Sequence, residues 1–91
     1  MILLAAYDLH QPGRDYGAIE ALLKSASGGF FHLQGSVWLL DTAESPKWWR
    51  DELRSRGDAN DEYFVTLITR SWAGLKMDGG GKWLKDPDRS W

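Results

Sequence analysis

Runs and stripes of apolar residues predict four strands along this chain. Residues 2–7 form a continuous apolar run of strand length, which is typical of a strand buried on both faces of a sheet. Residues 63–69 are rich in aromatic and β-branched types and predict a further strand, whose apolar side chains point to both faces. Two shorter strands are expected at residues 30–33 and 36–40, because the intervening Gln34-Gly35 favours a hairpin or a bulged bend.

Two helices are expected between these strands. The first covers about residues 16–26, where apolar residues three and four positions apart form a single stripe and Asp15 precedes them as an N-cap. The second covers about residues 46–56, because Ser45-Pro46 combines a capping hydroxyl with a proline at the first helical position. Gly57 is expected to end this second helix.

The predicted order, β-α-β-β-α-β over residues 1–70, indicates an α+β fold of the ferredoxin-like type. In this sandwich, a four-stranded antiparallel sheet carries both helices on one face. A sheet with apolar groups on both faces and helices on only one favours a partner, so we expect a homodimer. Residues 71–91 form a C-terminal extension with a flexible hinge at Gly79-Gly80-Gly81, and we expect this extension to pack on the partner subunit.

Composition and charge narrow the classes of function. The chain has 91 residues and no cysteine, which excludes disulfides, zinc fingers and thiol catalysis. No apolar run approaches the length of a membrane-spanning helix, so we expect a cytoplasmic protein without membrane contact. Residues 1–69 carry six Lys and Arg against ten Asp and Glu, whereas residues 70–91 carry five against three. The acidic body argues against indiscriminate binding to phosphate backbones but does not exclude a local basic patch.

Several short segments resemble a known family. Tyr7-Asp8 at the end of the first expected strand and residues 34–38 (Gln-Gly-Ser-Val-Trp) resemble the small dimeric subunit of the CRISPR adaptation machinery. The pattern of Tyr7-Asp8-Leu9, Pro12-Gly13 and Tyr16 is similar to that of SinR-like proteins, a set of small bacterial and phage proteins, and the virulence-associated protein D ribonucleases are similar in fold. The resemblance implies a ferredoxin-like homodimer, associated with a phage or another mobile element, in which one aspartate of each subunit faces the other across the dimer axis.

Asp8 is the candidate catalytic and metal-binding residue. By the resemblance, two Asp8 carboxylates face each other in the dimer, and a hard divalent cation, Mg²⁺ or Mn²⁺, would relieve their repulsion. The bound ion could activate water for cleavage of a phosphodiester, with His10 as a proton shuttle near neutral pH. Two alternatives remain open: Asp8 accepts backbone hydrogen bonds in the loop around Pro12-Gly13, and His10 is a solvated loop residue.

The six tryptophans divide by setting. Trp38 and Trp49 are predicted to lie in the core, whereas the tryptophans near the basic end have no stripe that buries them. Beside lysines and arginines, they could stack on the bases of a single strand of nucleic acid or anchor a protein partner. The candidate binding residues are Tyr7, Arg70, Trp72, Lys82 and Trp83. We therefore expect a non-catalytic binding or assembly module, with a magnesium-dependent RNA or DNA endonuclease as the alternative.

Overall fold

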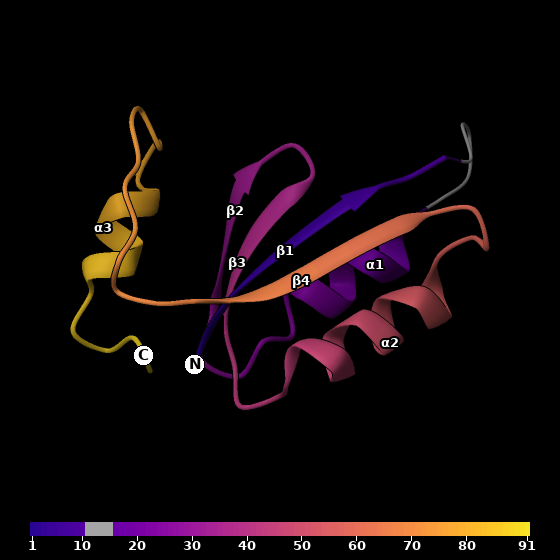
Figure 1. Cartoon of the computed structure of the whole chain (residues 1–91), viewed down its shortest axis with the longest axis horizontal. Coiled ribbons are helices and arrows are strands. Elements are labelled where there is room, and N and C mark those ends of the chain that lie inside the picture. Colours follow the sequence, from indigo (N-terminus) through magenta and orange to yellow (C-terminus); the bar gives the residue numbers. More distant parts are fainter. Residues whose placement is uncertain (11–15) are drawn as a thin grey trace.

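The computed structural model describes residues 1–10 and 16–91 of the chain. The predicted Pro12-Gly13 turn and the Asp15 N-cap therefore lie outside the described residues. Within these residues the elements are, in chain order, β1 (Ile2–Asp8), α1 (Gly17–Leu23), β2 (Phe30–Gln34), β3 (Val37–Asp41), α2 (Pro46–Arg56), β4 (Glu62–Ile68) and α3 (Gly80–Lys85). The described part of the chain is an α+β fold with one four-stranded antiparallel sheet and three helices (Figure 1). None of these helices has the length and apolar character needed to cross a membrane.

The sheet has the order β2-β3-β1-β4, and each pair of neighbouring strands is antiparallel. Ala5 of β1 lies between Trp38 of β3 and Val65 of β4. Because side chains alternate along a strand, this register directs the odd-numbered residues of β1 to one face of the sheet and the even-numbered ones to the other. The predicted bend between β2 and β3 is confirmed, and a bulge between His32 and Gln34 accompanies it.

The face covered by α1 and α2 holds the main core (Figure 1). Trp38 and Trp49 lie there as predicted, each 1% exposed. The Trp49 indole also has a buried partner, since its Nε1 donates a hydrogen bond to Thr42 Oγ1 at 3.1 Å. The other buried residues of this core are Leu3, Ala5, Ile19, Leu22, Leu23, Ala26, Leu40 and Leu53.

Local sequence accounts for the helix boundaries. Helix α2 covers the predicted range, because Ser45 Oγ accepts a hydrogen bond from the N–H of Trp48 at 3.1 Å and satisfies one free donor of the first turn. Helix α1 is shorter than predicted and ends at Leu23. The N–H of Ser25 bonds to the carbonyl of Leu22, three residues back, so the chain tightens out of the α-helix before Ala26.

The opposite face of the sheet is partly covered by the chain's own extension. Leu84 of α3 is 4% exposed and packs with Ile2 and Leu39 of the sheet, while Trp72 and Trp83 are half-buried around them. From the sequence we expect residues 71–91 to pack on a partner subunit, whereas in this structure they pack on the sheet of their own chain. In Figure 1, α3 accordingly lies at the β2 side of the molecule, away from α1 and α2.

Buried Asp41 of β3 fastens the end of the extension. Arg89 Nη1 lies 3.6 Å from Asp41 Oδ2 and donates a hydrogen bond to the carbonyl of Gly28 at 2.8 Å. The N–H of Ser90 donates to the same Asp41 oxygen at 2.9 Å, and the amino group of Met1 lies 4.0 Å from Oδ1. These contacts compensate the charge of a carboxylate that is 1% exposed, so the extension is joined to the sheet by polar groups as well as by apolar packing.

The interpretation of Gly79-Gly80-Gly81 as a flexible hinge is wrong, because Gly80 and Gly81 belong to α3. Gly79 precedes the helix with φ of 97°, a conformation that favours glycine. Gly80 is buried, and a Cβ at this position would lie 2.8 Å from Leu33 Cδ1. The glycines therefore allow α3 to approach β2 closely.

Candidate functional site

The structure brings Asp8 together with His10 and Glu62, and we call these three residues the acidic cluster. Asp8 ends β1 and Glu62 begins β4, and the two are paired in the sheet register. His10 lies just beyond β1, with Nε2 3.5 Å from Asp8 Oδ2 and 3.4 Å from Glu62 Oε1. Even-numbered residues of β1 point away from α1 and α2, toward the face on which the extension packs. The cluster lies at one end of this face, and all three of its residues are exposed.

Asp61, beside the cluster, holds the backbone at His10. Its Oδ1 accepts a hydrogen bond from the N–H of His10 at 2.8 Å. Further hydrogen bonds to this carboxylate come from the Tyr16 hydroxyl, the N–H of Asp58 and the Tyr63 hydroxyl. Desolvation raises the pKa of Asp61, but the hydrogen bonds favour the charged form and lower the pKa below its ordinary value of 3.8. Asp61 is therefore a positioning group that ties the end of β1 to the loop before β4.

The acidic cluster offers one imidazole and two carboxylates, a ligand set that suits a divalent cation. One ligand atom from each residue lies within 4.8 Å of the others. The side chains of Asp8 and Glu62 are 72% and 75% exposed, so water already solvates both charges. A metal is therefore compatible with the cluster but is not required to stabilise it.

Sequence reasoning identified Asp8 and His10 but missed Glu62 as their neighbour. The expected fold could have indicated this neighbour. In an antiparallel pairing of the first and last strands, the end of the first strand lies beside the start of the last one, where Glu62 stands. The expected facing of two Asp8 carboxylates concerns a dimer, and the single chain instead provides His10 and Glu62 near Asp8. The alternative that Asp8 caps the Pro12-Gly13 loop lies outside the described residues.

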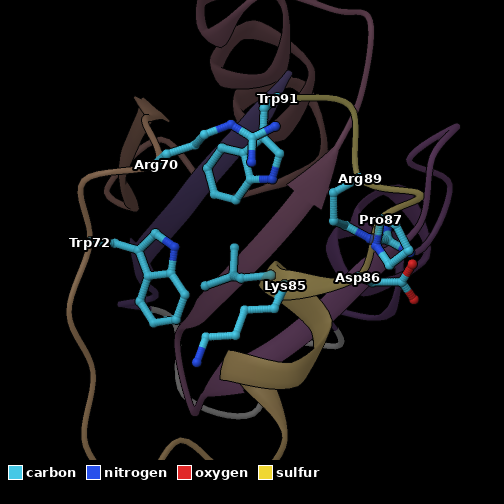
Figure 2. Close-up of a pocket in the computed structure, with 8 residues that line it drawn as sticks. Arg70, Trp72, Lys85, Asp86, Pro87, Arg89 and Trp91 are labelled. Carbon is cyan, nitrogen blue, oxygen red and sulfur yellow. The ribbon is translucent and has the colours of Figure 1, made fainter.

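A second candidate site is a pocket of about 520 Å³ between the end of β4 and the extension. We call it the extension pocket and define it by Arg70, Trp72, Leu84, Lys85, Arg89 and Trp91. Figure 2 shows the indoles of Trp72 and Trp91 on neighbouring sides of the pocket, with the Lys85 side chain extending below them. The volume lies within the range of ordinary small-molecule sites.

The structure divides the predicted binding residues among different places. Arg70 and Trp72 line the extension pocket. Trp83 instead packs under the guanidinium group of Arg89, whose carbon lies 4.2 Å from the ring centroid, and Lys82 is exposed outside the pocket lining. Tyr7 is on the other face of the sheet, packed against the main core, where its hydroxyl accepts a hydrogen bond from Trp38 Nε1 at 3.0 Å.

Lys85, Arg89 and Trp91 also line this pocket, and of these the sequence indicated Trp91 and Lys85 only as members of the basic, tryptophan-containing chain end, and Arg89 not at all. Their signal was the basic, tryptophan-containing composition of the chain end, which indicated the region without showing which side chains would converge. The convergence depends on the return of the chain after α3 along the sheet, where Ser90 meets Asp41.

Searches of protein-family models, curated proteins and solved structures find no match to this chain. The resemblance to the CRISPR adaptation subunit and to SinR-like proteins therefore remains a prediction. Any proposal for function depends on the acidic cluster, the extension pocket and the exposed surfaces of the sheet.

Proposed function

We propose that the chain is a ferredoxin-like homodimer that acts as a non-catalytic binding and assembly module, as its resemblance to the CRISPR adaptation subunit and to SinR-like proteins implies. The strand order β2-β3-β1-β4, with α1 and α2 on one face, supports the ferredoxin-like assignment. The observation that carries the homodimer is the outer edge of β4.

This edge is open and apolar. Strand β4 is seven residues long, and among the described residues it pairs with β1 on one side and with no strand on the other. Phe64 and Leu67 of β4 are 64% and 53% exposed and point to opposite faces of the sheet. A long edge with unpaired backbone groups attracts another strand, and pairing of two β4 strands would cover these side chains in both subunits.

The charges along β4 favour a second copy as the occupant of this edge. Glu62 begins the strand beside Asp8, whereas Arg70 follows its end. In an antiparallel pairing, the acidic start of each β4 approaches the basic end of the other. A twofold axis repeats this favourable arrangement at both ends of the paired strands, so one surface serves both subunits.

Sedimentation velocity of a Phe64→Lys/Leu67→Lys variant tests the homodimer. The native chain is expected to sediment as a dimer and the variant as a monomer, because pairing would force two lysines per subunit against apolar surface. Leu75→Lys is the matched control, since Leu75 is 85% exposed on the extension and its replacement is expected to leave the dimer intact. A native chain that stays monomeric at high concentration, or a double variant that stays dimeric, would contradict the proposal.

A magnesium-dependent nuclease is the second candidate function, and the acidic cluster is the observation that favours it. If the cluster binds Mg²⁺ or Mn²⁺, either ion raises the melting temperature of the native chain, because it binds the folded state alone. Asp8→Asn should abolish that rise together with any cleavage of RNA or DNA. The control is Asp51→Asn, which alters an exposed aspartate of α2 that pairs with Arg50. This variant should retain the rise in melting temperature and any cleavage. A native chain with no metal response and no cleavage rules out this candidate.

A further inference from the structure

The walls of the extension pocket are aromatic and its floor is apolar. Trp72 and Trp91 are half-buried, so each indole keeps one part packed in the fold and another part open to the pocket. Leu84, which is 4% exposed, also lines the pocket and packs with Ile2 and Leu39 of the sheet. A planar aromatic ligand could therefore stack on an indole without any rearrangement of the core.

The charge of the pocket is positive. Arg70 and Lys85 have no carboxylate within salt-bridge distance in residues 1–10 and 16–91, whereas Arg89 lies 3.6 Å from Asp41 and is committed to the fold. Asp86 is the one residue of the lining with a side-chain carboxylate, and it lies on the far side of the pocket from the Lys85 ammonium group (Figure 2). Two cations thus remain available to an anion that enters between the indoles.

Each of these two cations is held beside one of the two indoles. The guanidinium carbon of Arg70 lies 5.3 Å from the centroid of the Trp91 ring, and the Lys85 ammonium nitrogen lies 5.9 Å from that of Trp72. Both distances fall within the range of cation–π contacts. The pocket therefore presents aromatic faces and positive charges together.

We propose that the extension pocket binds a nucleotide unit, a nucleobase with an adjacent phosphate, as a free mononucleotide or as part of a single strand. Stacking on Trp72 or Trp91 suits a nucleobase, because every base has a π-face, and Arg70 and Lys85 suit the phosphate. An apolar ligand would leave both cations unused, and a simple inorganic anion would leave both indoles unused. The acidic body of residues 1–69 repels an extended phosphate backbone, which limits the contact to one or a few units.

Nuclear magnetic resonance of the tryptophan indole N–H groups tests this proposal in the native chain. Uridine monophosphate, the tetranucleotide (dT)4 and inorganic phosphate are titrated separately into ¹⁵N-labelled protein, with the indole signals assigned from single Trp→Phe variants. The signals of Trp72 and Trp91 should move with the two nucleotides, while that of Trp49, which is buried in the main core, should stay in place. Movement of Trp72 and Trp91 by inorganic phosphate alone, with the same affinity, would overturn the proposal.

Variants separate stacking from charge. Trp91→Ala should weaken the binding of (dT)4 by roughly fivefold to a hundredfold, whereas Trp48→Ala, which removes an exposed indole on α2, should not. Arg70→Gln/Lys85→Gln should weaken binding and reduce its salt dependence. The matched control, Lys24→Gln/Lys47→Gln, removes the same charge from two lysines outside the pocket. It should retain the native affinity for (dT)4 and its salt dependence.

The titrations with uridine monophosphate and (dT)4 together identify the source of the ligand. Similar affinities for uridine monophosphate and (dT)4 assign the pocket to a free nucleotide, and a much higher affinity for (dT)4 assigns it to a single strand. Absence of indole shifts with both nucleotides at millimolar concentration would overturn the proposal. So would equal binding by the Arg70→Gln/Lys85→Gln variant and its matched control. The residues that line this site belong to a single chain, but Arg70 also approaches the partner in the proposed dimer. The sedimentation of the Arg70→Gln/Lys85→Gln variant is therefore compared with that of the native chain, and the Trp91→Ala result separates a failure of this site from a failure of the dimer.

Discussion

The two faces of the sheet are built from the same strands but are covered in different ways. Beneath α1 and α2, one face buries a cluster of ten residues that includes Trp38 and Trp49. On the other face, a cluster of three buried residues joins Leu84 of the six-residue helix α3 to Ile2 and Leu39 of the sheet, surrounded by half-buried side chains. A closed face contributes stability, whereas a partly covered face keeps aromatic and charged groups accessible to a ligand.

Backbone strain also differs between the two faces of the sheet. Among the described residues, the non-glycine residues with positive φ are Lys76 at 56° and Asp78 at 48°, and both lie in the extension. Around the main core, the described residue with positive φ is Gly29, at 109°, where a glycine has no strain. The return of the extension across the sheet therefore has a conformational cost. The packing of Leu84 on Ile2 and Leu39 and the hydrogen bond from Ser90 to Asp41 offset that cost.

The largest expected effect is in the main core. Trp49→Ala should lower the free energy of unfolding by about 3–5 kcal/mol, because it leaves a large cavity and removes the partner of Thr42. A domain of this size has a total stability of about 5–10 kcal/mol, so the variant should be close to unfolded. Urea denaturation followed by circular dichroism measures the change. A loss below about 1 kcal/mol would show that the helix-covered face is not the dominant core.

A smaller effect is expected for the apolar centre of the second face. Leu84→Ala should destabilise the chain by about 2–3 kcal/mol, since Leu84 is nearly fully buried but its surroundings are open enough to relax. The same urea titration gives this value, and Leu75→Ala, which alters an exposed leucine of the extension, should change it little. If Leu84→Ala were as damaging as Trp49→Ala, the two faces would contribute equally and the contrast between them would fail.

The carboxylate of Asp61 should make the stability of the folded chain depend on pH. Its pKa is lower in the folded chain than the ordinary 3.8, so its contribution to stability is present above the unfolded pKa and is lost as the pH falls through the folded value. Asp61→Asn should therefore be less stable than the native chain at pH 7, and the difference should shrink below about pH 4. Thermal unfolding at a series of pH values measures it. A difference that is constant with pH would show that the charge of Asp61 has no role.

The smallest expected effect tests the strain in the extension. Lys76→Gly should raise stability by up to about 1 kcal/mol, because glycine relieves the left-handed backbone but also gains freedom in the unfolded chain. Lys82→Gly is the control, since Lys82 is in the helix α3 and its replacement should lower stability. Differential scanning calorimetry resolves changes of this size, and a destabilised Lys76→Gly variant would contradict the assignment of strain.

Local signals in the sequence were sufficient for most of the elements. Ser45, Pro46 and Gly57 determine the start and end of α2 through groups no more than a few residues apart, and the prediction of this helix is confirmed. The apolar run of β1 and the stripe of α1 likewise follow from neighbouring residues, and Ile19, Leu22 and Leu23 are buried as their spacing predicts. The same reasoning correctly assigned Trp38 and Trp49 to the core.

Long-range packing decided what local signals could not. Residues Gly80 and Gly81 have poor helix propensity and predicted a hinge, but the burial of Leu84 against the sheet offsets that propensity and α3 forms. Glu62 joins Asp8 only through the pairing of β1 with β4, which brings together residues far apart in the chain.

The sequence by itself therefore determined the order of the four strands and of α1 and α2, and it placed Trp38 and Trp49 in the core. It also pointed to Asp8 and to the basic chain end as candidate sites. The tertiary structure alone decided that His10 and Glu62 flank Asp8, and that Trp72 and Trp91 converge with Arg70 and Lys85 in one pocket. The physical reason is the range of the interactions: caps and periodicity act within one or two turns of the chain, whereas both sites require segments that meet only when the sheet has formed and the extension has packed on it.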